Sequence, residues 1–186
     1  LFLDKGHDVH IVDDLSTGNK KNIPSKAKFT NCNISNNKMM SSLLKKNNFD
    51  ILIHFAAFID VEESVRKPKK YLNNNFNNSI KLFNVCKKYS LNKIIFSSTA
   101  AVYGNSKLGY CSEKSKLKPM SMYAKSKLKF ENFLTPGTII VSDGRTANSL
   151  FLKNNFKRNW LFRINRTNDQ CYFYLKDPVL GLHNRK

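Results

Sequence analysis

The stretch DILIHFAA, residues 50–57, is nearly all apolar and decides the fold class. An apolar run of this length is typical of a strand buried on both faces of a parallel sheet. A second run of the same kind, KIIFSS at residues 93–98, follows an expected long helix over residues 69–88. Because strands that alternate with helices build doubly wound sheets, the sequence predicts an α/β protein with a doubly wound parallel sheet.

Other segments extend this alternation on both sides. The stretch DVHIVDD at residues 8–14 alternates apolar and polar residues as a strand does, and Gly6 suits the cap of a preceding helical turn. On the long helix, four apolar residues at helical spacing predict the inward face: Leu72, Phe76, Ile80 and Phe83. The remaining expected elements are strands at 28–34 and 138–142 and helices at 38–47 and 123–134.

The carboxyl ends of the predicted strands are where a doubly wound sheet binds its ligands. Three groups of residues stand at such ends, namely Asp13-Asp14, Phe55-Ala56-Ala57 and Ser97-Ser98-Thr99. These are therefore the candidate site residues that the fold class alone indicates.

The net charge of +19, from 32 basic and 13 acidic residues, raises the possibility of a nucleic-acid partner. Lysines occur on every kind of segment, and a dispersed excess mostly makes a solvated surface that also favours a diphosphate ligand. The basic, aromatic stretch from Phe151 to Arg166 around Trp160 keeps a nucleic-acid-binding protein as a distant alternative; it also fits an amphipathic helix followed by a strand. We expect no nucleic-acid partner.

The four cysteines form no C-x-x-C pair, and their spacings match no zinc pattern. His7 and His10 lie close together without an evident third ligand, so we expect no metal site. Free, mostly buried thiols indicate a reducing compartment, and we expect a cytoplasmic protein. The sequence, which starts at Leu1, shows no apolar run long enough for a membrane span and no signal peptide.

Tyr123 and Lys127 are the candidate catalytic couple. Four residues apart, they lie on one face of the predicted helix. A nearby ammonium lowers the pKa of a tyrosine, whose phenolate then takes a proton from a substrate hydroxyl. Thr99 is the hydroxyl expected beside that proton, whereas Ser97 and Ser98 also fit simple capping of a strand end. A surface lysine beside a packed tyrosine is the alternative interpretation of the couple.

Asp13 stands at the end of the strand predicted at residues 8–14, where a carboxylate accepts hydrogen bonds from an adenosine ribose. A carboxylate there repels a 2′-phosphate, and Asp14 doubles the negative charge, so the pair favours NAD over NADP. The alternative is a loop carboxylate that caps the following turn.

Four stretches in order carry a family resemblance: GHDVHIVDDLSTG, DILIHFAAFIDVEESVRKPKKYLNNNF, KIIFSSTAAVYG and MYAKSKLKFENFL. Together they resemble the extended short-chain dehydrogenase/reductase family, and within it the NAD-dependent epimerase/dehydratases of UDP-glucose 4-epimerase type. The resemblance covers residues 1–134 and implies a Rossmann-like sheet, NAD as the cofactor and a nucleotide sugar as the substrate.

The resemblance also implies individual roles. Tyr123 is the base, Lys127 assists it and bonds the nicotinamide ribose, and Thr99 lies beside the sugar O4. The other implied cofactor-binding residues are Asp13, Ser16, Phe55, Ala56, Ala57, Asn75 and Ser97. For Asn75 the alternative is one polar residue within an Asn-rich run.

The implied reaction oxidises the sugar at C4 to a ketone and returns the hydride to the other face. A related dehydratase or decarboxylase is the near alternative, although VEESVRKPKKY at residues 61–71 favours the epimerase. The resemblance further implies a homodimer formed through the long helix and the Tyr-Lys helix.

Three departures from the family pattern qualify these expectations. The family's first strand and its turn G-x-x-G-x-x-G, which places backbone N–H groups against the diphosphate, would precede Leu1. Without them we expect weak NAD binding, and a catalytically inactive fragment is the second hypothesis. Asn33 stands where the family usually has aspartate beside the adenine. Residues 1–134 are thus expected to form a partial NAD-binding domain, and 135–186 a divergent segment in which the family's next strand is not recognisable.

Overall fold

The computed structural model describes residues 2–105, 115–134, 139–141, 150–152, 161–167 and 170–176. Two groups of parallel strands carry the fold. The first pairs β1 (His10–Asp13) with β2 (Lys28–Asn31) in parallel, and the second places β3 (Leu52–His54), β4 (Ile94–Ser97) and β5 (Ile139–Val141) side by side in parallel. The predicted α/β class with parallel strands is therefore confirmed.

The order of the strands identifies the topology. A doubly wound sheet of the dinucleotide-binding kind has the strand order 3-2-1-4-5-6. Here β2-β1 reproduces the 3-2 part and β3-β4-β5 the 4-5-6 part, while the position between β1 and β3 holds no strand among the described residues. The expectation of an incomplete doubly wound sheet is confirmed.

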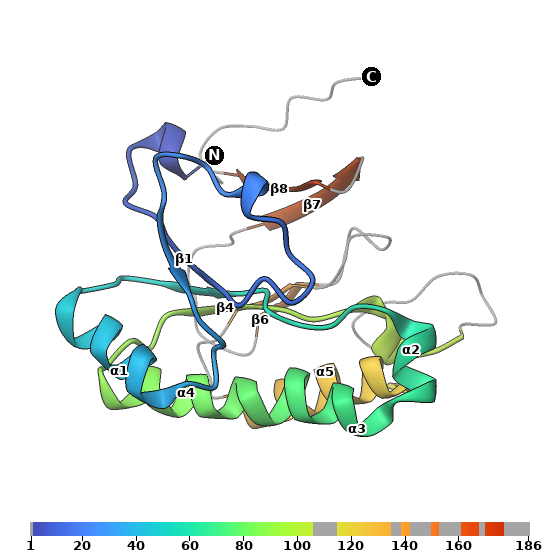
Figure 1. Cartoon of the computed structure of the whole chain (residues 1–186). Helices are drawn as coiled ribbons and strands as arrows, with labels where there is room; N and C mark the ends of the chain where they lie inside the picture. Colours follow the sequence, from blue (N-terminus) through green and yellow to red (C-terminus); the bar gives the residue numbers. More distant parts are fainter. Residues whose placement is uncertain are drawn as a thin grey trace, which may run out of the picture.

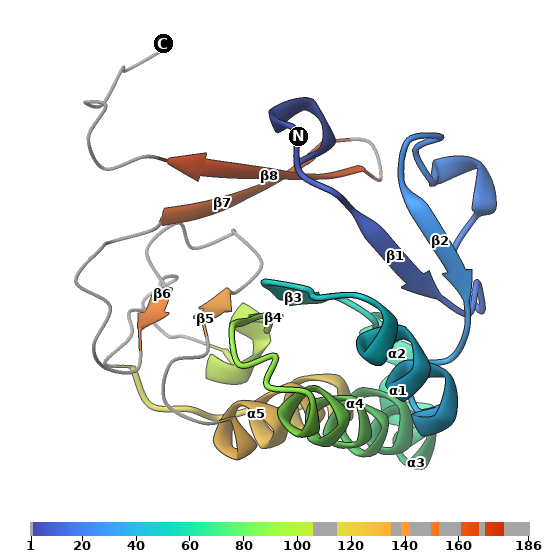
Figure 2. The ribbon, with the colours of Figure 1, turned by 90° about the vertical axis from the view of Figure 1, so that its left-hand side faces the viewer.

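Helices cover one face of these strands. Figure 1 shows α1 (Asn37–Lys46), α4 (Asn78–Lys88) and α5 (Met122–Phe133) below the strands. In Figure 2 the chain steps from β1 to β2 in one direction and from β3 to β4 and β5 in the other, so the winding changes direction between β1 and β3. That point of reversal is where ligands of this fold class bind.

Two apolar clusters hold the helices to the strands. One gathers Met40 and Leu44 of α1 with residues of α4, and Val12 of β1 and Leu52 of β3 both pack against it. The other joins Ile94 and Phe96 of β4 to Phe130 of α5. Since β1 and β3 rest on the same cluster, the two groups of strands share one helical layer (Figure 2).

The long helix predicted over residues 69–88 is confirmed, with one irregularity. It is built from α3 (Pro68–Tyr71), a π-helical turn η3 (Leu72–Asn77) and α4. At the end of η3 the N–H of Asn78 donates to the carbonyl of Asn73, five residues earlier. All but the last asparagine of the Asn-rich run, Asn78, fall within this turn, and π-helical turns occur frequently at functional sites.

The predicted inward face of this helix packs against the core, but the deepest burial lies one residue position earlier. Phe83 is buried in the second apolar cluster, and Phe76 and Ile80 are half-buried against it. The deepest stripe lies one position earlier and includes two polar residues: Tyr71, Asn75, Ser79, Leu82 and Cys86, all at most 2% exposed. The polar members are accommodated because they find hydrogen-bond partners inside, as described below.

The prediction that residues 50–57 form a strand buried on both faces is also wrong in part. Only Leu52–His54 is strand, and of these only His54 is buried. Ile51 and Phe55 at its two ends are 48% and 40% exposed. The reason is topological, because β3 pairs with β4 on one side and with no described strand on the other.

The tail contains the next strand of the sheet, β5 (Ile139–Val141), which confirms the strand predicted at 138–142 although the family's next strand was not recognisable there. β5 pairs in parallel with β4, and Ile140 is buried in the second apolar cluster. β6 (Leu150–Leu152) adds to β5 in antiparallel fashion, and β7 (Leu161–Thr167) pairs with β8 (Gln170–Lys176). The expected break at 135–137, the turn at 143–145, Cys111 and Trp160 lie outside the described residues.

The short elements complete the described chain. They are the 3₁₀ turns η1 (Leu3–Lys5), η2 (Lys20–Asn22) and η4 (Ala100–Tyr103) and the helix α2 (Val61–Arg66). Gly6 caps η1 with a left-handed conformation, as predicted. Within the described residues, Cys32 and Cys86 are free and buried, no cluster of metal-ligating side chains occurs, and no helix is long and apolar enough to cross a membrane.

Candidate functional site at the carboxyl edge of the sheet

The candidate residues come from the carboxyl ends of three parallel strands. His54 of β3 pairs with Phe96 of β4, so the residues that follow them leave the sheet at the same edge. Phe55-Ala56-Ala57 follows β3, while Ser97 ends β4 and Thr99 is the N-cap of η4. Asp13 ends β1 at the same edge of the other strand pair. The strand ends predicted from the sequence are thus the edge at which the site is built.

Helix α5 places Lys127 against this edge of the sheet. The helix begins where the Ser121 hydroxyl accepts the N–H of Ala124, which places Tyr123 and Lys127 in the first turns. Lys127 is 3% exposed, its Nζ donates to the carbonyl of Ser97 at 2.8 Å, and it lies 4.9 Å from the centre of the Phe96 ring. Tyr123 is also buried, so the surface-lysine alternative is excluded.

Thr99 and Ser98, which follow β4, hydrogen-bond to the two elements beside it, η4 and α5. Thr99 is 1% exposed, and its hydroxyl oxygen accepts the N–H of Ala101 at 3.2 Å, capping η4. Ser98 is equally buried and donates to the carboxylate of Glu131 on α5. Together with the bond between Lys127 and Ser97, this contact locks α5 onto the end of β4. The sequence analysis did not single out Glu131, which lies one helical turn after Lys127.

The segment after β3 offers an exposed surface held on a fixed backbone. Phe55 is 40% exposed at the strand end, and Ala56 and Ala57 are half-buried. At Phe58 the N–H donates to Asn75 Oδ1 and the carbonyl accepts from Asn75 Nδ2, both at 2.9 Å. The amide of Asn75 therefore contacts the loop, and its half-buried neighbour Asn74 donates to it at 3.1 Å.

The loop after β1 folds back over Asp13. The carboxylate of Asp13 accepts the N–H of Leu15 at 2.7 Å, and Leu15 has a left-handed backbone with φ of 56°. A Cβ on Gly18 would lie 3.3 Å from the same carboxylate. The backbone strain at Leu15, where leucine is uncommon, marks this turn as a constrained segment beside the carboxylate.

Asp14 and Asn33 form a pair beside Asp13. Asn33 Nδ2 donates to Asp14 at 2.6 Å, and the N–H of Ser16 donates to the other oxygen at 3.0 Å. Burial raises the pKa of Asp14, but the hydrogen bonds from Ser16 and Asn33 outweigh it and hold this pKa below its ordinary value. The amide at position 33 thus serves as a donor to a charged neighbour.

Replacing Asn33 with aspartate is expected to lower the free energy of unfolding by ~1–2 kcal/mol at pH 7, because two carboxylates would meet in place of a donor and an acceptor. The contacts of Asn33 Oδ1 with Ser35 would remain. Denaturant unfolding at pH 7 checks this. The double exchange Asp14→Asn with Asn33→Asp restores one donor and one acceptor and should recover most of the loss; an equally unstable double variant would contradict the assignment.

His54 is a buried titratable residue that the sequence analysis left without a role. Its Nε2 lies 2.7 Å from the Ser79 hydroxyl, which itself donates to the carbonyl of Asn75 at 2.9 Å. Because a hydroxyl has one hydrogen, the proton of the ring belongs on Nε2. Burial, and then the charge of Lys127, lower the pKa of His54 to about 3, so the ring is neutral. A histidine inside an otherwise apolar strand, as in DILIHFAA, is the sequence feature that would have indicated a buried, hydrogen-bonded ring.

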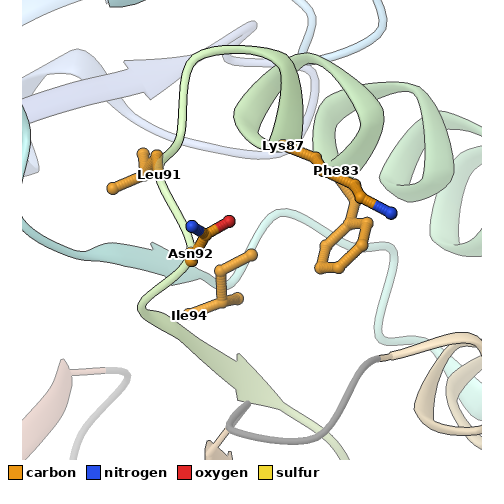
Figure 3. Close-up of a pocket in the computed structure, with 5 residues that line it drawn as sticks. All are labelled: Phe83, Lys87, Leu91, Asn92 and Ile94. Carbon is orange, nitrogen blue, oxygen red and sulfur yellow. The ribbon is translucent and has the colours of Figure 1, made fainter.

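A small cavity of about 50 Å³ lies elsewhere and belongs to no part of this site. Figure 3 shows its lining, with Phe83 and Lys87 from α4, Leu91 and Asn92 from the following loop and Ile94 from β4. Ile94 is the first residue of β4. The cavity therefore lies at the amino end of that strand, opposite the edge that carries Thr99.

The fold and the site define a doubly wound α/β protein whose polar residues gather at the switch point between its two groups of strands. The sequence profile described as "NAD dependent epimerase/dehydratase family" matches residues 1–136. The chain belongs to this family.

Individual relatives agree with this assignment. The UDP-glucose 4-epimerase of Lactobacillus helveticus is 35% identical over 130 residues, which are 70% of this chain and 39% of that protein. The UDP-Glc/GlcNAc 4-epimerase structure from Campylobacter jejuni superposes with a TM-score of 0.71 at 35% identity, covering 76% of this chain and 47% of that one. The Bifidobacterium longum UDP-glucose 4-epimerase, solved in complex with NAD⁺ and UDP, gives 0.69 at 32% identity, covering 76% and 46%. The chain thus spans about 40% of the length of the curated relatives it matches.

Proposed function

We propose that this chain forms the cofactor-binding and base-bearing part of an NAD-dependent epimerase that inverts C4 of a nucleotide sugar of the UDP-glucose/UDP-galactose type. The observation that carries the proposal is Lys127, buried against Ser97 one helical turn after Tyr123. Family membership supports the reaction class. We further propose that residues 1–134 are the cofactor-binding part and that 135–186 form a divergent segment, of which β5 joins the same sheet.

The described residues fit NAD. An exposed Phe55 followed by two small residues leaves the loop open to a ligand at the switch point, and Asp13 supplies an acceptor for a ribose. The proposed NAD contacts are Asp13, Ser16, Phe55, Ala56, Ala57, Ser97, Tyr123 and Lys127. When bound, NAD supplies an acceptor for the hydride that leaves C4 of the sugar.

The protein's own residues move the proton. Tyr123, as phenolate, takes the proton of the sugar O4 hydroxyl as C4 becomes a ketone, and returns this proton when the hydride comes back to the opposite face. The positive charge of Lys127 favours the phenolate form over the phenol. The hydroxyl of Thr99, fixed at the start of η4, orients O4 toward Tyr123.

We also propose a homodimer built on the outer faces of the long helix and α5. Phe133 on α5 is 37% exposed, and Phe76 and Ile80 of the long helix, although they pack against the second apolar cluster, are only half-buried. Apolar side chains on neighbouring helices are what a second copy of the same pair would cover.

The test combines binding with turnover. Titration calorimetry with NAD, followed by conversion of UDP-galactose to UDP-glucose, should show binding, and Tyr123→Phe should lower turnover at least roughly a hundredfold while NAD still binds. Tyr89→Phe, a half-buried tyrosine on the far end of the long helix, is the matched control and should change neither. NAD binding without turnover would support the inactive-fragment hypothesis. No binding at all, or full activity of Tyr123→Phe, would refute the proposal.

A further inference from the structure

The inward stripe of the long helix carries three hydrogen-bonding side chains at successive turns, namely Tyr71, Asn75 and Ser79. Each reaches a different point of the segment that leaves β3. Their partners occur in the reverse order along the chain: Glu63, Phe58 and His54. The helix therefore runs antiparallel to this segment and is fastened to it at three points.

The first point fixes the end of the strand. The ring N–H of His54 donates to Ser79 at 2.7 Å, and the Ser79 hydroxyl in turn donates to the carbonyl of Asn75. Both side chains are at most 3% exposed. Rings of Phe96 and Phe130 lie 5.6 and 5.7 Å from the ring of His54, which leaves it little freedom to move.

The second point fixes the loop backbone. Asn75, 1% exposed, bonds both the N–H and the carbonyl of Phe58 at 2.9 Å. An amide that donates to and accepts from one residue reproduces the pairing of a strand with its neighbour. The ring of Phe58 is held as well, 5.8 Å from the ring of Tyr71 and 4.3 Å from Lys70 Nζ.

The third point fixes the start of α2. The hydroxyl of Tyr71 donates to Glu63 at 3.1 Å, and Lys70 and Lys67 bond the same carboxylate at 2.8 and 3.2 Å. Hydrogen bonds from Lys70 lead the causes that lower the pKa of Glu63 to about 2, so the carboxylate is charged at neutral pH. Because Glu63 has three donors, loss of the tyrosine hydroxyl alone leaves it anchored.

We propose that these three pairs, the helix clamp, set the conformation of Phe55-Ala56-Ala57, and that Asn75 and Ser79 are positioning residues acting through that loop. The three residues lie between the first two anchors, His54 and Phe58, which are both tied to the same helix. Asn75 then supports cofactor binding through the backbone of Phe58 and not by touching the cofactor. This rests on the proposed function only where it concerns NAD.

The order of effects follows from the geometry. Asn75→Ala removes both bonds to the loop backbone and should have the largest effect. Ser79→Ala releases the strand end and should have a smaller one, and Tyr71→Phe the smallest, since the lysines still hold Glu63. Asn73→Ala, in the same π-helical turn but exposed, is the matched control.

Hydrogen exchange by mass spectrometry at residues 55–60 is the decisive measurement. Asn75→Ala should raise exchange of this peptide at least roughly tenfold while peptides of β4 and α5 exchange as in the unmutated chain. Calorimetric NAD affinity should fall in the order Asn75→Ala, Ser79→Ala, Tyr71→Phe, with about a tenfold loss for the first. Asn73→Ala should match the unmutated chain in both measurements.

The outcomes separate the two proposals. Unchanged loop exchange in Asn75→Ala overturns the clamp, whether or not NAD binds. Lost NAD affinity with unchanged loop exchange would make Asn75 a direct ligand and also overturns it. If the unmutated chain binds no NAD, the proposed function fails, whereas the exchange data still decide the clamp. Exchange raised equally in every peptide would mean global destabilisation, and that too contradicts a local anchor.

Discussion

Replacing Gly104 with alanine is expected to destabilise the fold by ~3–5 kcal/mol, a loss large enough to unfold many domains. Gly104 ends η4 with φ of 67° and ψ of −150°, a backbone region that is open essentially to glycine alone. A Cβ there would lie 2.3 Å from the carbonyl oxygen of Lys118, which is backbone and cannot swing away.

The expected damage is also local to the site. The N–H of Lys118 donates to the carbonyl of Val102 at 2.9 Å, so the segment before α5 is hydrogen-bonded to η4 at this point. Pushing the two apart disturbs the segment that leads to Ser121, the residue that starts α5 and thereby places Tyr123. Loss of one such bond costs on the order of 1 kcal/mol beyond the steric term.

Gly6 provides the matched control. It also has a positive φ, of 81°, but a Cβ there would meet no atom within 4 Å. Gly6→Ala should therefore cost ~1 kcal/mol, the conformational term alone. Urea unfolding of both variants at one pH measures the difference. Equal losses for the two variants would show that the close approach to Lys118 does not exist in solution.

The free energy of unfolding is expected to fall by about 1.4 kcal/mol for each pH unit below about 6.5 on account of His54 alone. Burial lowers the native pKa of this ring from 6.5 to about 3. Between these two pH values the unfolded chain binds a proton that the native chain does not, so stability is lost as the pH falls through this window and is fully present above it. By pH 3 the total approaches ~5 kcal/mol.

Other groups contribute in the same direction but can be separated. Burial also lowers the pKa of His10, and the lowered carboxylate pKa values of Asp14 and Glu63 act below their ordinary range near 4. His54→Gln keeps a donor for Ser79 and removes the titration. Unfolding measured at pH 7.0 and 5.0 should show a clearly shallower loss in this variant than in the unmutated chain.

A direct measurement completes this test. The Hε1 resonance of His54 should show no protonation shift between pH 7 and 5, in contrast to a solvent-exposed imidazole. A midpoint near 6.5 for His54, or an unchanged pH dependence of unfolding in His54→Gln, would contradict its burial as a neutral ring.

The errors of sequence interpretation all concern which neighbours a segment meets. Residues 50–57 have the composition of a strand buried on both faces, yet β3 borders an unfilled position among the described strands and Phe55 is exposed. The long helix has an apolar stripe through Phe76 and Ile80, yet its deepest stripe passes through Asn75 and Ser79. Hydrophobic periodicity measures how apolar a face is, and it does not detect polar residues whose partners lie inside.

The contacts of Asn75, Ser98 and Lys127 could not be predicted from the sequence either, because their partners lie far away along the chain. A lysine four residues after a tyrosine is common on surfaces, and only the contact with Ser97 distinguishes this one. The interpretation of Ser98 as a strand-end cap gives no hint of its bond to Glu131, thirty-three residues later. The resemblance implies that Asn75 binds the cofactor, whereas in the structure its amide is hydrogen-bonded to the backbone of Phe58.

By itself, the sequence determined the alternation of strands and helices, the family, and the strand ends that make up the candidate site. Local patterns suffice for these, because a strand's hydrophobic pattern and the polar residues at its end lie within a few residues of each other. Only the tertiary structure decided that Lys127 is buried, that Gly104 lies against Lys118, and that the long helix is hydrogen-bonded to the loop after β3. Such contacts join segments far apart in the chain, and their free energy depends on packing and desolvation that exist only once the chain has folded.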